Sequence, residues 1–283
     1  MRPNMAAGPI HLLEAGIVTE QRYAGAGTAL AALGGALAER LAPSKRVRIP
    51  FNPRDRWLTA ARESCRSLAD AVTSSLGAGA LPVVIGGECT LVAGTITGAL
   101  AVERDLALLY FDAHGDFNTL ATTPSHYVGG MCLAHVCGRH VAPLLWPGVR
   151  TIGDENVALV GARHLDSGEA LNLDASRVRR LVFDADHPGA HGLLAFARRR
   201  PVWIHVDIDV VDPGEMPAVA SPVSGGPSLS ALSRVLREVG AVSDVRGVEL
   251  CGYDPTKDPT ARLVAPLAEL LAVAVRETAL VRR

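Results

Sequence analysis

Three residues whose side chains commonly bind metal ions stand at alternate positions in Asp112-Ala113-His114-Gly115-Asp116. This segment follows the apolar run Leu106–Phe111, which predicts a strand buried on both faces. Residues two apart in an extended chain point to the same side. The pattern therefore predicts that Asp112, His114 and Asp116 share one face where the strand ends.

A second pair of carboxylates follows another apolar run later in the chain. Val202–Val206 leads directly into Asp207-Ile208-Asp209, which again places two acidic side chains on one face at a strand end. Together the two segments offer four carboxylates and one imidazole. Carboxylate and imidazole are ligands of divalent cations, and five of them are enough to hold a pair of such ions.

Three more strand ends carry groups that could take part in a site. Ile85 leads into Gly86-Gly87-Glu88-Cys89-Thr90, Val160 leads into residues 161–169, and Val248 leads into Glu249. In parallel sheets, ligands bind outside the carboxyl ends of the strands. The sequence therefore predicts that all these groups meet at one edge of a sheet.

Alternating helical and strand patterns predict the fold class. Charged residues spaced as in amphipathic helices predict five helices: Ala26–Leu41, Arg54–Leu76, Thr90–Leu100, Ser228–Val239 and Pro259–Val281. Short apolar runs between them predict six strands: Leu81–Ile85, Leu106–Phe111, Val157–Val160, Arg180–Phe183, Val202–Val206 and Val245–Leu250. We expect residues 1–283 to form a single α/β domain, a three-layer αβα sandwich with a mostly parallel sheet.

Bulk composition excludes several classes of partner. The 283 residues are 48% hydrophobic with a formal net charge of -1, so no general attraction to nucleic acid or anionic membrane is expected. No signal peptide and no membrane-spanning run is evident, which predicts a cytoplasmic protein whose five cysteines are free thiols. We expect four of them to be small buried residues. Cys89 differs, because a helix N-terminus lowers the pKa of a thiol and favours the thiolate.

These motifs resemble those of the ureohydrolases, the arginase and agmatinase family of manganese enzymes. The resemblance covers roughly Leu81 to Asp254. Asp-Ala-His-Gly-Asp at 112–116 is similar to the first metal motif of the family, and Asp-Ile-Asp-Val-Val-Asp-Pro at 207–213 to the second. Pro-Val-Ser-Gly-Gly at 222–226 resembles a further family loop, and Gly161-Ala162-Arg163 with Asp166 and Glu169 resembles the substrate loop of arginases.

The resemblance implies an arginase-like fold and two Mn²⁺ ions with the ligands Cys89, Asp112, His114, Asp116, Asp207 and Asp209. Asp112 and Asp207 would bridge the two ions. A metal-bridging hydroxide would attack a guanidino carbon and release urea or a substituted urea. Asp116, His114 and Glu249 would act in catalysis. The substrate would contact Asp166, Glu169, Glu249, His126 and Asn118.

Two departures from the family pattern refine this interpretation. Cys89 stands where the family usually has a metal-binding His, and Gly129 stands where arginases have a proton-shuttling His. A branch that hydrolyses Nω-hydroxyarginine is similar in both respects and also has Tyr-x-Gly-Gly-Met, as at 127–131. This predicts a modified guanidine as substrate. Thiolate is softer than imidazole, which predicts a first site that is weak for Mn²⁺ or takes another divalent metal, with either Cys89 or Glu88 as ligand.

Alternative interpretations remain for several residues and for the function. Asp166 and Glu169 have the spacing of a first helical turn. His205 would serve equally as a hydrogen-bonded core or supporting histidine, and His126 as a surface loop residue. The chain could be an agmatinase or a formimidoylglutamase, or a catalytically impaired member acting as a binding protein. By resemblance we expect a homo-oligomer, trimeric or hexameric, with a small guanidino compound as partner.

Overall fold

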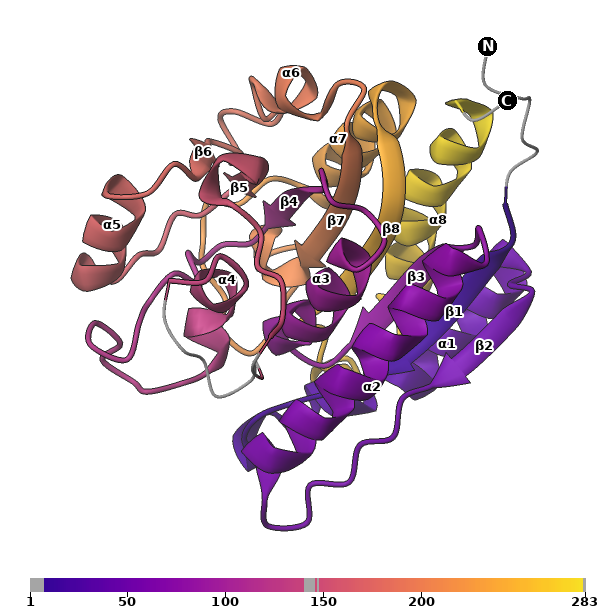
Figure 1. The fold of residues 1–283 in the computed structure, drawn as a ribbon, viewed down its shortest axis with the longest axis horizontal. Coiled ribbons are helices and arrows are strands. Elements are labelled where there is room, and N and C mark those ends of the chain that lie inside the picture. Colours follow the sequence, from indigo (N-terminus) through magenta and orange to yellow (C-terminus); the bar gives the residue numbers. More distant parts are fainter. Residues whose placement is uncertain (1–7, 140–145, 147, 282–283) are drawn as a thin grey trace.

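The computed structural model describes residues 8–139, 146 and 148–281. Eight parallel strands form one twisted sheet in the order β2-β1-β3-β8-β7-β4-β5-β6 (Figure 1). The strands are β1 Ile10–Ala15, β2 Lys45–Arg48, β3 Leu81–Gly86, β4 Ala107–Phe111, β5 Val157–Val160, β6 Arg179–Leu181, β7 Pro201–Asp207 and β8 Asp244–Cys251.

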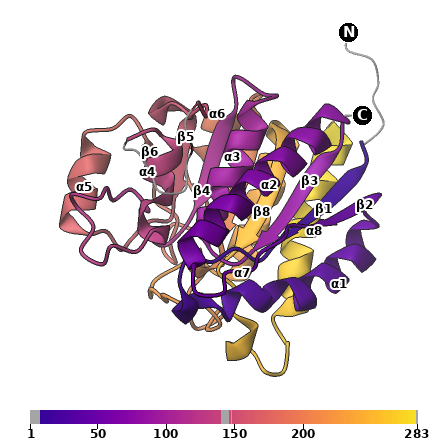
Figure 2. The ribbon, with the colours of Figure 1, turned by 60° about the horizontal axis from the view of Figure 1, so that its bottom comes forward.

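Helices cover both faces of the sheet, which makes the three-layer α/β sandwich predicted from the sequence (Figures 1 and 2). The helices are α1 Ala29–Leu41, α2 Trp57–Gly77, α3 Val92–Leu100, α4 Cys132–Val136, α5 Ser167–Asp174, α6 Leu193–Ala197, α7 Leu229–Val242 and α8 Val264–Val281. Leucines of α1, α7 and α8 pack in one core layer. Residues of α2, α3 and α4 pack in the other layer.

The central strands β4 and β7 alternate between the two core layers. Leu109 of β4 and Ile204 of β7 belong to the layer with α8, whereas Tyr110 and Trp203 belong to the layer with α3. Both faces of these strands are therefore apolar, as parallel strands between two helical layers require. The pairing of Phe111 with Val206 brings the two strands to an end side by side. The residues that follow them necessarily meet.

Sequence patterns missed the two strands at one edge of the sheet and three short helices. Edge strand β2 reads Lys-Arg-Val-Arg and is largely exposed, so it lacks the apolar run that identifies a buried strand. Helix α8 starts at Val264, later than the predicted Pro259. All described strand pairs are parallel. No described helix has both the length and the apolar content needed to cross a bilayer.

Candidate metal centre

A cavity of about 630 Å³ opens at the carboxyl ends of the central strands. All six predicted metal ligands line it: Cys89, Asp112, His114, Asp116, Asp207 and Asp209. They come from the segments after β3, β4 and β7, which are separated in sequence but adjacent in the sheet through β8. The prediction that these strand ends converge is confirmed in the arrangement of the sheet.

Backbone amide groups at the strand ends orient the carboxylates. The amide of His114 donates to Asp112 Oδ1 at 2.7 Å, and the amide of Asp209 donates to Asp207 Oδ1 at 2.9 Å. The amide of Ala113 donates to Asp209 Oδ1 at 3.1 Å. In each of these aspartates a backbone amide holds Oδ1. This fixes the orientation of the carboxylate and leaves Oδ2 without a backbone partner among these contacts.

His114 lies between two of these carboxylates. Its Nδ1 is 3.3 Å from Asp112 Oδ1 and 3.0 Å from Asp209 Oδ2. Burial lowers the pKa of the imidazole, but the hydrogen bonds to Asp112 and Asp209 and their charges outweigh burial and raise it to about 12. A proton on His114 therefore supplies the positive charge that a cation would supply among the same three side chains.

Asp116 reaches the cavity through an unusual backbone conformation. Its φ is +50°, in the left-handed region, and its carbonyl accepts hydrogen bonds from the amides of Leu133 and Ala134 in α4. Its Oδ2 accepts from the Tyr110 hydroxyl at 2.6 Å and from the Cys132 thiol at 3.2 Å. Such a conformation persists only where surrounding contacts hold it, and here these contacts aim the carboxylate at the site.

Cys89 lies against the two aspartates that would bridge the metals. Its thiol is 2.8 Å from Asp207 Oδ2 and 3.4 Å from Asp112 Oδ2. Complete burial, together with neighbouring thiols and the charge of Asp207, raises the pKa of Cys89 well above its ordinary value. The expectation that the helix N-terminus lowers this pKa is wrong, because the low-polarity surroundings and nearby anions outweigh the dipole of a short helical turn.

Glu88 points away from the ligands, toward the wall of the cavity. Its Oε1 accepts from the Thr19 amide and the Thr90 hydroxyl, both at 2.9 Å, and its Oε2 accepts from the Tyr127 hydroxyl at 2.8 Å. Of the two alternatives at this position, the geometry favours Cys89 as the ligand, because Glu88 is already held by three donors.

The donor set fits divalent cations. Two groups each bring three ligand atoms within 4.8 Å of one another: Cys89 with Asp112 and Asp207, and Asp112 with His114 and Asp209. Burial and neighbouring carboxylates raise the pKa of Asp112, and of Asp207 to about 6. Within the described ranges, no lysine or arginine forms an ion pair with these aspartates. A concentration of buried acids without lysine or arginine partners is stabilised by bound cations.

The sequence and the fold of this chain are similar to those of known proteins. Residues 2–275 match the sequence profile described as "Arginase family". The chain belongs to this family. It is 33% identical over 227 residues to the N(omega)-hydroxy-L-arginine amidinohydrolase of Streptomyces lavendulae, covering 78% of this chain and 80% of that protein. Arginase from Bacillus subtilis superposes with a TM-score of 0.81 and 26% identity, covering 94% of this chain and 98% of that structure.

Arginase-family membership, together with the ligand groups, assigns the chain to metal-dependent hydrolases of guanidino and related amidine carbons. The structure also shows what surrounds Gly129, which stands where arginases have a proton-shuttling His. A Cβ at this position would lie 2.4 Å from the Tyr127 ring. Tyr127, which lines the cavity and donates to Glu88, therefore fills the place where an arginase would carry a side chain.

The substrate loop of this arginase-family chain supports the cavity from the side of α5. Asp166 and Glu169 form a capping box at the start of α5, so the structural interpretation of their spacing is confirmed. Asp166 Oδ2 also accepts from Asn118 Nδ2 at 2.9 Å, and Glu169 Oε1 accepts from the Phe117 amide at 2.8 Å. Asn118, Asp166 and Glu169 all line the cavity, so capping leaves their predicted substrate role in place as a prediction.

Two predicted substrate contacts lie elsewhere. Glu249 is fully buried in β8, is absent from the cavity lining and pairs with His205, so the structure does not place it against the cavity and its substrate role stays a prediction. Glu249 lies two residues before the end of β8, and its carboxylate is buried against His205. His126 is exposed on the loop before Tyr127 and also lies outside the cavity lining, as its alternative assignment to the surface predicts.

Some residues at the site were not predicted from the sequence. His164 lines the cavity with its ring 5.6 Å from that of His114, and its place in the substrate loop was a usable signal. Cys251 lies 3.8 Å from Cys89, although it was expected to be an inert buried residue. Only the register of β7 and β8 reveals this contact, because it pairs Cys251 with Asp207.

Proposed function

We propose that this chain hydrolyses the guanidino carbon of an arginine-like compound and releases urea or a substituted urea, with Nω-hydroxy-L-arginine as the favoured substrate. The observation that carries the proposal is the convergence of Asp112, His114, Asp116, Asp207 and Asp209 on one cavity. The named activity of the Streptomyces lavendulae relative and the replacement of the shuttle position by Gly129 support a hydroxylated guanidine.

Two Mn²⁺ ions would be held by side chains that line the same cavity. Cys89, Asp112, Asp116 and Asp207 would hold the first, and Asp112, His114, Asp207 and Asp209 the second. When bound, the pair would lower the pKa of water and polarise the guanidino group. The backbone hydrogen bonds to Asp112, Asp207 and Asp209 hold the ligands in place, so little reorganisation is needed on binding.

The far end of the cavity would bind the amino-acid part of the substrate. Asp166 offers a carboxylate for an ammonium group, and Asn118 holds that carboxylate by a hydrogen bond. Glu169 fixes the loop by accepting from the backbone of Phe117 and of Asp166. This arrangement would orient the guanidino end toward the aspartate ligands.

Proton transfer to the departing amine needs a group other than residue 129. Imidazole is the side chain that ordinarily exchanges protons near neutral pH. His164 lines the cavity beside His114, so we assign it this role. A hydroxyguanidine is less basic than a guanidine and relies less on such a transfer, which fits the absence of the shuttle His.

An assay that measures the released amine together with urea, hydroxyurea or formamide, run on a panel of guanidines and one formimidoyl compound, tests the proposal. L-arginine, Nω-hydroxy-L-arginine, agmatine and formimidoylglutamate would be compared with and without added Mn²⁺. We expect Mn²⁺-dependent turnover, fastest on Nω-hydroxy-L-arginine. Faster turnover of agmatine or formimidoylglutamate would replace the substrate assignment, and no turnover by a metal-loaded protein would favour a binding role.

Three further expectations stay proposals. We propose that residues 1–283 form one domain, that the protein works in the cytoplasm, and that it assembles as a homo-oligomer. Light scattering of the purified protein measures the last of these directly. A monomer at micromolar concentration would contradict it.

A further inference from the structure

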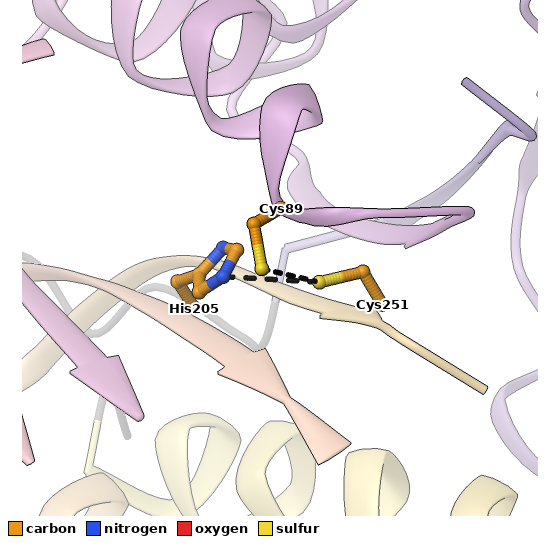
Figure 3. A group of neighbouring side chains, drawn as sticks. All are labelled: Cys89, His205 and Cys251. Atoms are coloured by element: carbon orange, nitrogen blue, oxygen red, sulfur yellow. Dashed lines mark hydrogen bonds between the residues drawn. The ribbon is translucent and has the colours of Figure 1, made fainter. Parts of the chain in front are cut away.

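Three side chains with sulfur or imidazole ligand atoms lie close together, and only Cys89 of the three lines the cavity (Figure 3). Cys89 follows β3, His205 lies in β7 and Cys251 ends β8. Their exposed fractions are 7%, 0% and 1%. Their ligand atoms all lie within 4.8 Å of one another.

The register of the sheet brings Cys89, His205 and Cys251 together. β7 and β8 pair His205 with Glu249 and Asp207 with Cys251, and β3 pairs with β8 through Ile85 and Leu250. Residues that alternate along a strand share a face, so His205 and Asp207 point to the same side. The chain leaving β3 then places Cys89 over that side.

The distances match those of a tetrahedral zinc site. Cys89 Sγ and Cys251 Sγ are 3.8 Å apart, and Cys251 Sγ is 3.8 Å from His205 Nε2. Two thiolates bound to one Zn²⁺ at about 2.3 Å each lie about 3.8 Å apart in a tetrahedron, and a thiolate and an imidazole nitrogen about 3.6 Å apart. The three ligands therefore need little movement to bind one ion.

Glu249 prepares His205 for this role. Its Oε1 lies 2.6 Å from His205 Nδ1, so the imidazole donates from Nδ1 and leaves the lone pair of Nε2 facing Cys251. The Tyr110 ring stacks on the imidazole at 4.1 Å, with 7° between the planes, and fixes its orientation. A carboxylate that accepts from the second nitrogen is the usual support of a metal-bound histidine.

We propose that Cys89, Cys251 and His205 form a zinc site next to the proposed manganese pair, with Asp207 Oδ2 beside the two thiols. This oxygen lies 2.8 Å from Cys89 Sγ and 3.6 Å from Cys251 Sγ. Thiolates select Zn²⁺ over Mn²⁺, whereas carboxylates suit Mn²⁺. On binding, each thiol releases its proton to water and His205 binds through Nε2. The site goes beyond the proposed hydrolysis, shares Cys89 with the proposed first manganese position, and uses neither Asp112, His114 nor Asp209.

Cobalt substitution tests the site under reducing conditions. Chelator-treated protein reloaded with Co²⁺ should show thiolate-to-cobalt charge-transfer absorption and the intense visible bands of tetrahedral Co²⁺. Cys251→Ser should lose about half of the charge-transfer intensity, because one of two thiolates is removed. Cys65→Ser is the matched control: Cys65 is equally buried and donates to the Thr90 carbonyl, outside the site. Equal spectra for wild type and Cys251→Ser would overturn the proposal.

X-ray absorption at the zinc edge tests the same site in the wild-type protein, without any substitution. We expect two sulfur neighbours at about 2.3 Å. A shell of oxygen and nitrogen alone would overturn the site. Ornithine release from Nω-hydroxy-L-arginine with Mn²⁺, measured on the same preparation, separates the two proposals. Hydrolysis without sulfur-bound zinc would leave the proposed function intact, and sulfur-bound zinc without hydrolysis would leave the zinc site intact.

Discussion

Two imidazoles at the site show how differently its two halves are built. His114 lies between the carboxylates of Asp112 and Asp209 at the cavity, with its side chain 24% exposed. His205 is fully buried and lies between the Glu249 carboxylate and the Cys251 thiol. The first environment suits hard cations open to substrate, and the second suits a soft cation enclosed by protein.

Asp207 joins these halves. Its Oδ1 accepts from the Asp209 amide on the carboxylate side, and its Oδ2 accepts from the Cys89 thiol on the other. One replacement, Cys for the usual histidine at residue 89, therefore changes the chemistry of both halves. We expect it to weaken the proposed first manganese position and to supply one of the two thiols of the proposed zinc site.

The largest expected effect is loss of the carboxylate half. Asp112→Ala and Asp207→Ala each remove a predicted bridge between cations. Loss of even a supporting residue costs about 10- to 100-fold, so loss of a bridge should cost more than about 100-fold in the rate of amine release. Retention of more than about a tenth of the wild-type rate by either variant would contradict the paired-metal assignment.

Substitutions at residue 89 should change which metal each half of the site binds. Cys89→Ser should lose the zinc site and weaken the first manganese position, whereas Cys89→His should strengthen Mn²⁺ binding there. Glu88→Gln is the matched control, because Glu88 is bound to Thr19, Thr90 and Tyr127 and should leave metal content unchanged. Elemental analysis after dialysis measures all three. Unchanged zinc and manganese in Cys89→Ser would remove Cys89 from both sites.

Glu249→Gln tests the enclosed half alone. The amide still fills the space but no longer holds His205 as a carboxylate does, so zinc affinity should fall by about 10- to 100-fold. KM for the guanidine should stay the same, because Glu249 does not line the cavity. Competition with a zinc chelator gives the affinity. A raised KM with unchanged zinc affinity would support the substrate role first predicted for Glu249.

Asp166→Asn tests the substrate end of the open half. It can still cap α5, and its loss of charge should reduce kcat/KM by about tenfold, the size of one charge-assisted hydrogen bond. Metal content should not change. The exposed Asp186, outside the cavity lining, gives the control variant Asp186→Asn. A loss of metal in Asp166→Asn would show that this carboxylate supports the metal ligands instead.

The smallest effect concerns the stability of the metal-free protein. Burial raises the pKa of Glu169 to about 7 from its ordinary 4.5, although the Phe117 amide partly offsets it. The folded state then binds more protons than the unfolded state between these values, so this stabilisation is lost as pH rises through about 7. Glu169→Gln should therefore show a smaller drop in Tm between about pH 5 and about pH 8 than wild type. Parallel melting curves at both pH values would contradict the shift.

The sequence identified the carboxylate half because its ligands alternate directly after apolar strands. Asp112, His114 and Asp116 needed only local periodicity. The thiol half depends on which strands are neighbours. His205 and Cys251 meet through the register of β7 and β8, which no local pattern contains. The sequence pattern also placed Glu249 close to the end of its strand. In the structure β8 continues to Cys251, so Glu249 lies two residues before that end.

Anomalous X-ray diffraction from crystals loaded with both Zn²⁺ and Mn²⁺ tests the division between the halves most directly. Data at the two absorption edges locate each element separately. We predict a zinc peak between Cys89, His205 and Cys251, and manganese peaks at the carboxylates, including one beside His114 and Asp209. Zinc at the carboxylates with no metal between the two thiols would contradict the account.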